Sequence, residues 1–296
     1  MDGIFNIDKP SGWTSHDVVA RVRRLAGQKR VGHAGTLDPI ATGVLPVVLG
    51  TATRLVEYLA DADKAYRATL VLGVTSDTYD REGALTPSAS TLMPSRDDVE
   101  TALQQFRGEI EQLPPMHSAI KVGGKKLYEL ARRGIEVERQ PRRVIISSLE
   151  LIEYKPPTLQ IFVECSKGTY IRSLAHDLGV ALGTGAYLEE LVRTRHGPFT
   201  LEGAITLGNL EVAFLEGNWE ASLYPPDYII SDWKAQVASV EQERDVAQGK
   251  PVTFPPPQPG DRTVVALRAQ NGELLAILYW DNDMGTWRPK KVFNAS

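Results

Sequence analysis

The most informative stretch of the 296-residue sequence is a glycine- and proline-rich segment, Gly32-His33-Ala34-Gly35-Thr36-Leu37-Asp38-Pro39-Ile40-Ala41-Thr42-Gly43-Val44-Leu45-Pro46. It lies between an amphipathic pattern and an apolar run, so we expect a tightly folded loop. Its glycines permit a positive φ or close approach of the backbone to a ligand, and Pro39 pushes Asp38 toward extended geometry. An isolated Asp-Pro pair is typically a turn or a helix cap. Taken alone, the segment therefore leaves Asp38 open as a turn residue or as a functional carboxylate.

Two further segments combine aromatic and charged residues at the ends of expected strands. Cys165-Ser166-Lys167-Gly168-Thr169-Tyr170-Ile171-Arg172 places a glycine turn, a tyrosine and an arginine where a strand passes into a helix, and Asp63-Lys64-Ala65-Tyr66-Arg67-Ala68 enters another strand. The ordinary interpretation is that both tyrosines pack in the core and that Arg172 faces solvent.

The pattern around these segments predicts an α+β fold. Thr14 and Asp17 have capping-box spacing before a helix over about 16–27, and Ser95 and Asp98 repeat that spacing before a second helix. Residues 66–73, 144–154 and 158–165 alternate as strands do, and a helical pattern follows from Ile171 to Leu182. Because βαβ alternation is absent, we expect a largely antiparallel sheet flanked by helices.

The character of the chain changes after about residue 226. A helix is expected over 239–248, and Asn271-Gly272 between two apolar strands is a strong hairpin signal. We therefore expect a large domain over 1–228, long enough to be a catalytic domain, and a small β-rich module over 229–296.

Composition and motifs exclude several classes of protein. The single Cys165 excludes a disulfide framework, and no apolar run reaches the ~18 residues that a membrane span needs. No phosphate loop, nucleophile elbow or dinucleotide fingerprint is present, and the five histidines lack metal-ligand spacing. We expect a cytoplasmic protein with no metal and no cofactor. The His16-Asp17 and His176-Asp177 pairs leave a metal-dependent hydrolase as an alternative.

The net charge of −4 argues against a nucleic-acid partner until its distribution is considered. Residues 114–147 contain eight Lys or Arg and three Glu, which gives +5. Such a run is usually a solvated face, but it is also the composition of a phosphate-binding surface.

Together, the ordered motifs resemble those of the TruB family of tRNA pseudouridine synthases. The resemblance extends over roughly residues 1–200. Its segments are Asp8 to Ser15, Gly32 to Pro46, Lys64 to Arg67, Gln112 to Ala119, Gly124 to Tyr128, Lys167 to Arg172, Leu191, and Arg193 with Thr194.

The resemblance implies a pseudouridine-synthase fold and an isomerase that converts the T-loop uridine at position 55 of tRNA. It implies that Asp38 is the catalytic aspartate, that Arg172 pairs with it, and that Tyr66 packs on the flipped base and is a candidate for removing the C5 proton. The implied substrate-binding residues are His33, Tyr170, Leu191, Lys9, Gly35 and Thr36. The implied RNA-backbone contacts are Lys121, Lys125, Lys126, Arg132, Arg133 and Arg142, and the tail takes the place of a PUA-like module.

The implied partner is the T-arm of tRNA, with no membrane and no protein partner, for a monomeric enzyme that uses no cofactor. Attack at C1′, attack at C6 and a glycal route all remain open. An RNA chaperone or ribonucleoprotein subunit that keeps the fold without the catalysis is the binding-module alternative.

Overall fold

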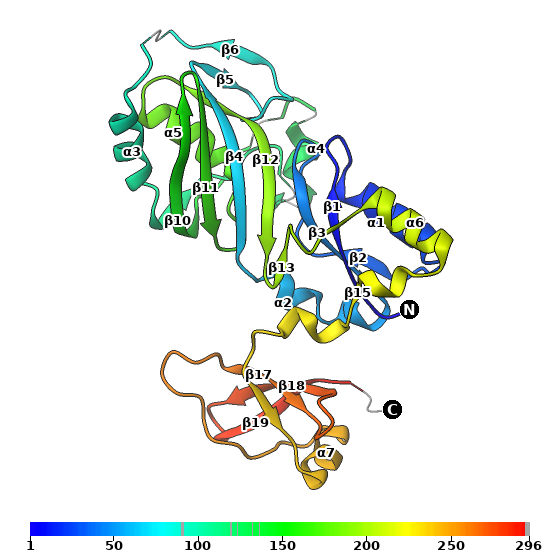
Figure 1. The fold of residues 1–296 in the computed structure, drawn as a ribbon. Helices are drawn as coiled ribbons and strands as arrows, with labels where there is room; N and C mark the ends of the chain where they lie inside the picture. Colours follow the sequence, from blue (N-terminus) through cyan, green and yellow to red (C-terminus); the bar gives the residue numbers. More distant parts are fainter. Residues whose placement is uncertain (90–91, 119, 123, 132, 136, 294–296) are drawn as a thin grey trace. The chain divides into compact units, whose positions relative to one another are not determined.

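The computed structural model describes residues 1–89, 92–118, 120–122, 124–131, 133–135 and 137–293. Contacts divide the chain into two compact units, Met1–Pro226 and Asp227–Ser296, against an expected boundary after residue 228. Figure 1 shows both units, and each is described by itself.

The first unit is built on a long mixed sheet with the strand order β14-β1-β3-β12-β4-β11-β10-β7. The described neighbours on this path are antiparallel except β1 with β14 and β3 with β12, which are parallel, so the prediction of a largely antiparallel sheet is confirmed. The strands on the path are β1 (Gly3–Lys9), β3 (Thr42–Leu49), β4 (Lys64–Leu72), β7 (Gly108–Gln112), β10 (Arg142–Lys155), β11 (Thr158–Cys165), β12 (Ala186–His196) and β14 (Ile205–Thr206). Three short strands pair at its margins, β2 (Val31–His33), β13 (Phe199–Thr200) and β15 (Leu223–Tyr224).

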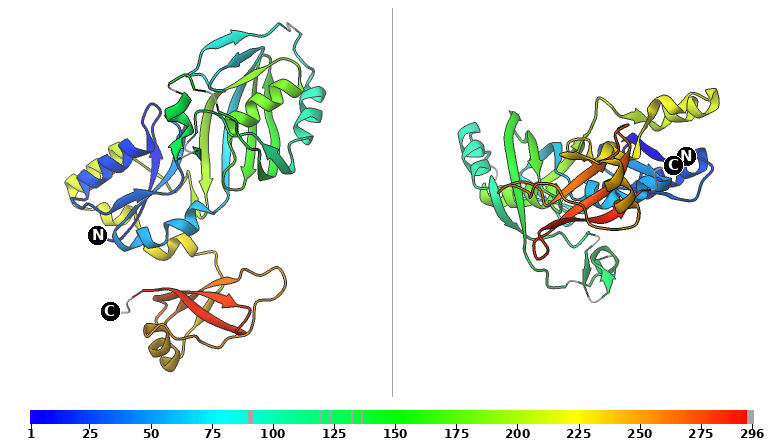
Figure 2. Two further views of the ribbon diagram at one scale, coloured as in Figure 1. Left: turned by 180° about the vertical axis from the view of Figure 1, so that it is seen from behind. Right: turned by 90° about the horizontal axis from the view of Figure 1, so that it is seen from below.

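The helices cover the sheet in two groups. Helices α3 (Arg96–Gln104) and α5 (Ile171–Ala181) pack on one face of the half formed by β10, β11, β4 and β12 (Figure 2). Helices α1 (Ser15–Leu25) and α6 (Leu207–Glu216) pack together beside β1, β2 and β3. The predicted capping boxes are present at the starts of α1 and α3. The remaining helical turns of this unit are η1 (Gly50–Arg54), α2 (Val56–Ala60) and η2 (Trp219–Ser222), and η3 (Pro226–Ile230) begins at its end.

Two small hairpins and a short helix lie off the main sheet. β5 (Val74–Ser76) pairs with β6 (Leu85–Pro87), and the turn between them, residues 76–84, matters for the site below. Within the basic segment, β8 (Lys121–Val122) pairs with β9 (Lys125–Lys126), and α4 (Leu127–Ala131) follows.

The second unit is a four-stranded sheet with one helix. Its strands are β16 (Ala235–Val237), β17 (Val264–Arg268), β18 (Leu274–Asp281) and β19 (Thr286–Val292), and its helix is α7 (Val240–Ala247). β17 and β18 form the hairpin predicted at Asn271-Gly272, and Trp287 is buried in its separate apolar core. The expected small β-rich fold of this region is confirmed.

Candidate active site

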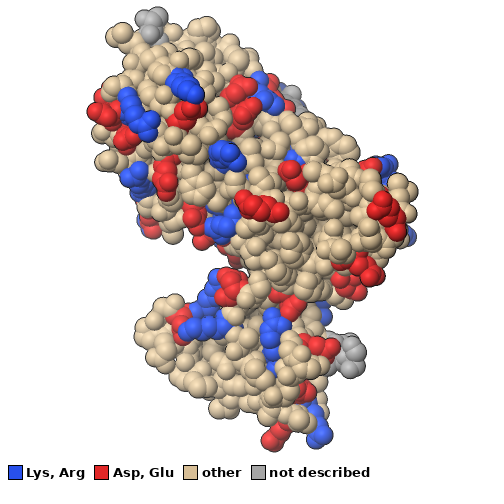
Figure 3. Space-filling model, in the orientation of Figure 1, with Lys and Arg blue, Asp and Glu red and all other residues tan. Residues whose placement is uncertain are grey.

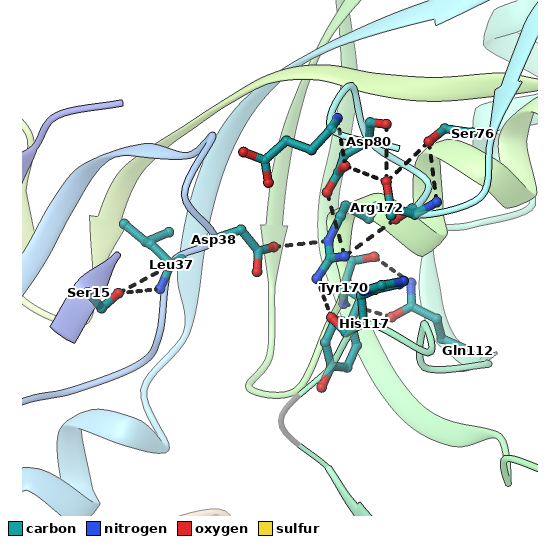
Figure 4. A network of polar contacts seen from close by, with 11 residues as sticks. Ser15, Leu37, Asp38, Ser76, Asp80, Gln112, His117, Tyr170 and Arg172 are labelled. Carbon is teal, nitrogen blue, oxygen red and sulfur yellow. Dashed lines mark hydrogen bonds and ion pairs between the residues drawn. The ribbon is translucent and has the colours of Figure 1, made fainter. Parts of the chain in front are cut away.

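The loop that carries Asp38 leaves β2 and returns as β3, and it is fixed from beneath by buried polar groups. Ser15, the first residue of α1, accepts a hydrogen bond from Leu37 N at 2.8 Å and donates to Leu37 O at 3.1 Å (Figure 4). Lys9 is fully buried, and its Nζ donates to the carbonyls of Pro10, Trp13 and Pro39 at 2.9, 2.6 and 3.2 Å. The backbone on both sides of Asp38 is therefore held in place before any ligand arrives.

Arg172 lies at the centre of the site, one residue into α5. Its Nε lies 3.0 Å from Asp38 Oδ2, and its Nη1 lies 3.6 Å from Asp80 Oδ2. Its Nη2 donates to His117 O at 2.9 Å and its Nη1 to Thr78 O at 3.4 Å. The Arg172 side chain is 5% exposed whereas that of Asp38 is 38% exposed. The guanidinium, drawn with its partners in Figure 4, thus holds a carboxylate that remains partly exposed.

Asp80 is the site residue that the sequence did not indicate. It lies in the 76–84 turn with 3% exposure, and its Oδ1 accepts from Thr78 Oγ1 at 2.6 Å and from Glu82 N at 3.1 Å. Nothing local in the sequence separates it from Asp77, which lies in the same polar turn and is exposed. Only the fold, which brings α5 against this turn, identifies it.

The charges around Asp38 act on its acidity in opposite directions. Burial raises the pKa of the Asp38 carboxyl, the nearby Arg172 lowers it, and the Asp80 carboxylate raises it again. Burial lowers the pKa of Lys9 to about 8, against the opposing effect of Asp38. Arg172 is therefore the main group that favours the ionised form of Asp38.

Tyr66 and Leu191 come together through the register of two central strands. Tyr66 on β4 pairs with Arg193 on β12, and Ala68 pairs with Leu191, so these four residues lie on one face. Tyr66 and Leu191 are each 6% exposed. Burial raises the pKa of Tyr66, and the nearby guanidinium of Arg193 acts in the opposite sense.

Arg193 also joins this pair of strands to the Asp38 loop. It is 1% exposed, and it donates from Nε to Val44 O at 2.6 Å and from Nη2 to Gly35 O at 3.1 Å. In the sequence, Arg193 stands out only through its Arg193-Thr194 motif, and its burial and its contacts are evident only from the fold.

Tyr170 is the N-cap residue of α5, directly before Ile171 and Arg172. Its backbone N donates to Gln112 Oε1 at 2.7 Å, and Gln112 Nε2 donates back to Tyr170 O at 3.0 Å. This reciprocal pair fixes the start of the helix that presents Arg172. Burial raises the pKa of the half-buried Tyr170.

The other expected substrate residues of the loop differ in exposure. His33 ends β2 and is half-buried, and within the described part of the chain its Nδ1 is a buried atom with no hydrogen-bond partner. Burial lowers its pKa, and the electrostatic effects of the nearby His16 and Arg193 act in the same direction. Gly35 has φ 69°, and a Cβ there would lie 3.0 Å from His196 Cε1, so glycine is required; Thr36 is exposed.

The expected RNA-backbone residues are described only in part. Lys121, Lys125 and Lys126 lie on β8 and β9, whose side chains are outside the description, and Arg132 lies outside the described residues altogether. Arg133 and Arg142 are exposed. On the face drawn in Figure 3, basic and acidic side chains are interspersed and form no broad patch of one sign.

In the two His-Asp pairs that suggested a metal-dependent hydrolase, Asp17 caps a helix and His176 packs against an aromatic ring. Asp17 closes the capping box of α1, and the His176 ring stacks on Tyr79 at 4.0 Å between centroids. Within the described ranges, no three His, Cys, Asp or Glu side chains gather as a metal site would require. No helix among them is long and apolar enough to cross a membrane.

Comparison with known proteins identifies the family. The model of the TruB family pseudouridylate synthase N-terminal domain matches residues 23–171, and that of the tRNA pseudouridylate synthase B C-terminal domain matches residues 172–230. The chain belongs to the TruB family. A tRNA pseudouridine synthase B of Dehalococcoides mccartyi is 46% identical, with 99% of this chain and 97% of that protein covered. Another, of Symbiobacterium thermophilum, is 54% identical over 78% of this chain and 77% of that protein.

Solved structures agree with the TruB assignment. A chain in the crystal structure of a Cbf5-Nop10-Gar1 complex is similar with a TM-score of 0.77 at 29% identity, covering 99% of this chain and 85% of that one. A chain in an H/ACA RNP bound to a substrate RNA containing 2′-deoxyuridine gives 0.75 at 27% identity, with 99% and 85% covered. The predicted pseudouridine-synthase fold is confirmed. The TruB domain models end at residue 230, so the small C-terminal sheet lies outside both.

Proposed function

We propose that this chain is a cytoplasmic tRNA pseudouridine(55) synthase. It breaks the C1′–N1 bond of the T-loop uridine, lets the uracil turn, and rejoins it through C5. The observation that carries the proposal is the ion pair between Asp38 and Arg172, in which an accessible carboxylate is oriented by a buried guanidinium. TruB membership supplies the reaction class, and the tRNA pseudouridine synthase B relatives support the substrate.

The proposed reaction requires few protein groups beyond this carboxylate and a closed pocket. An isomerisation involves no net oxidation and no external group, so no cofactor is required by the balance of atoms. Asp38 acts at the sugar–base junction as a nucleophile or as an electrostatic partner. Arg172 favours its ionised form and points it in one direction.

The substrate base has to leave the stack before reaction, and aromatic or apolar surfaces receive it. Tyr66 and Leu191, on adjacent strands, supply such a surface, and Tyr66 is our candidate for removing the C5 proton. Tyr170, the N-cap residue of α5 two residues before Arg172, is our second candidate for contact with the base. His33 stabilises the displaced T-loop.

Lys9, Gly35 and Thr36, which the family resemblance implies as substrate-binding residues, have different roles in this proposal. The three N–H groups of Lys9 are engaged by protein carbonyls, so Lys9 supports the Asp38 loop from beneath. Gly35 lets the loop backbone approach Arg193 and His196 closely, and the exposed Thr36 faces incoming RNA.

Phosphate contacts come from the basic segment 114–147, which contributes affinity without reading bases. The small C-terminal sheet is our candidate for a PUA-like RNA-binding module. We propose that the enzyme works as a monomer on the T-arm without a protein partner.

The decisive test is Asp38→Asn with tRNA labelled with tritium at uracil C5. Tritium release should fall below detection, while the tRNA dissociation constant and the thermal unfolding temperature stay close to those of the wild type. Full release by Asp38→Asn would refute the assignment. Wild-type protein that binds tRNA but releases no tritium would favour the RNA-chaperone alternative, and loss of activity on adding EDTA to prefolded tRNA would favour the metal hydrolase.

A further inference from the structure

The turn that carries Asp80 contains a strained residue. Among the described residues, Tyr79 is the non-glycine residue with a positive φ, at 65°. Bulky L-residues avoid this left-handed region because Cβ crowds the backbone, and such conformations persist only where the surroundings impose them. The strain directly precedes the buried carboxylate that pairs with Arg172.

Backbone contacts hold this part of the turn to the central sheet. Tyr79 N donates to Ser76 O at 3.1 Å, Leu188 N donates to Tyr79 O at 2.9 Å, and Arg81 N donates to Leu188 O at 3.0 Å. These bonds tie residues 79–81 to β12, but none of them involves α5, which carries Arg172.

The Tyr79 side chain adds a further connection to α5, beside the hydrogen bond from Arg172 Nη1 to Thr78 O at 3.4 Å. Its ring stacks on that of His176, with centroids 4.0 Å apart and planes 13° from parallel. His176 lies four residues after Arg172 on α5, so both side chains project from the same helix face one turn apart. Helix α5 therefore contacts two consecutive residues of the turn: His176 stacks on the ring of Tyr79, and Arg172 forms an ion pair with Asp80.

The ion pair needs such support. Arg172 Nη1 lies 3.6 Å from Asp80 Oδ2, longer than the 3.0 Å between Arg172 Nε and Asp38 Oδ2. A modest shift of the turn would carry Asp80 out of range, and Arg172, left with its hydrogen bond to His117 O, would be oriented less firmly toward Asp38.

We propose that the stacked rings of Tyr79 and His176 form a positioning clamp that holds Asp80 against Arg172 and thereby orients Asp38 for the isomerisation. The inference rests on the proposed function for its kinetic consequences. It assigns His176, which the sequence singled out only as part of a His-Asp pair, to the support of the active site.

The kinetic test compares His176→Ala, which removes the ring, with His176→Phe, which keeps a flat ring in its place. In single-turnover reactions at saturating tRNA we expect His176→Ala to lower the rate constant about tenfold, because small misplacements of reacting groups are costly. The dissociation constant for tRNA should change by less than about twofold, because no phosphate contact is touched. His176→Phe should restore the rate to within about threefold of the wild type.

A double substitution distinguishes this role from general stability. Since His176 acts through Asp80, adding His176→Ala to Asp80→Asn should slow the reaction by no more than about twofold beyond Asp80→Asn alone. Tyr79→Gly is the partner variant: it removes the ring, tolerates the left-handed backbone, and should reproduce the loss of rate without loss of thermal stability. The clamp is refuted if His176→Ala keeps the wild-type rate, if His176→Phe is as slow as His176→Ala, or if the effects of His176→Ala and Asp80→Asn multiply.

A crystal structure of the His176→Ala protein gives a readout that does not depend on activity. We expect the Arg172 Nη1–Asp80 Oδ2 separation to exceed the ~4 Å limit of an ion pair; an unchanged separation would overturn the clamp. If the wild type itself formed no pseudouridine, the proposed function would fail, while this measurement would still decide the clamp.

Discussion

Asp80→Asn tests how strongly the second carboxylate supports catalysis. The substitution keeps an oxygen that can accept from Thr78 and Glu82, so the turn should survive, and it removes one negative charge 3.6 Å from Arg172 Nη1. At an effective dielectric constant of about 20, charges this far apart interact by roughly 4–5 kcal/mol before desolvation and reorganisation are counted. Pairs of this kind retain about 2 kcal/mol net. If Arg172 depends on that energy for its orientation, the single-turnover rate constant falls roughly 30-fold.

The assay for Asp80→Asn is tritium release at saturating tRNA, with the dissociation constant measured separately. Asp77→Asn is the matched control, because it removes the same charge from an exposed side chain of the same turn, whose Oδ1 accepts from Ala84 N at 2.8 Å. Its rate should stay within about twofold of the wild type. Equal rates for Asp80→Asn and Asp77→Asn would refute the supporting role of Asp80. A loss confined to tRNA affinity would do so as well.

Three further predictions follow from groups around the Asp38 loop. The pKa of Lys9 is about 8 in the folded protein and 10.5 when unperturbed, so between these pH values the unfolded chain binds more protons and the free energy of unfolding rises with pH, by roughly 3 kcal/mol. Denaturant titrations of Lys9→Met should show a smaller rise than those of the wild type. The same pH dependence in both proteins would contradict the burial of the Lys9 charge. Arg172 lowers the pKa of Asp38, so in Arg172→Gln the acid limb of the single-turnover pH profile should move to higher pH, and movement to lower pH would contradict the ion pair. Gly43 and Gly27 both have a positive φ, but a Cβ at Gly43 would lie 2.3 Å from a carbonyl oxygen of β12, whereas a Cβ at Gly27 would meet nothing within 4 Å. Gly43→Ala should therefore lower the free energy of unfolding by about 2 kcal/mol more than Gly27→Ala does. Equal unfolding midpoints of the two variants in urea would refute the close approach at Gly43.

The sequence predicted those parts of the site whose signals are local or carried by a motif. The capping boxes at Thr14 and Ser95 involve residues three positions apart, so they can be recognised from the sequence alone. Both are present in the structure. Asp38 and Arg172 were paired through their motifs, and the structure places Nε and Oδ2 3.0 Å apart. Asp80 was missed because its partner lies on a distant helix, and only the packing of α5 against the turn separates it from Asp77.

The use of two carboxylates around one guanidinium follows from what the reaction requires of Asp38. A buried cation left without a counter-charge is costly, and Asp38 has to engage the sugar–base junction in the proposed reaction. Asp80 is buried and hydrogen-bonded within its own turn. Arg172 therefore keeps a counter-charge throughout the proposed reaction, while Asp38, with 38% of its side chain exposed, remains accessible to the substrate.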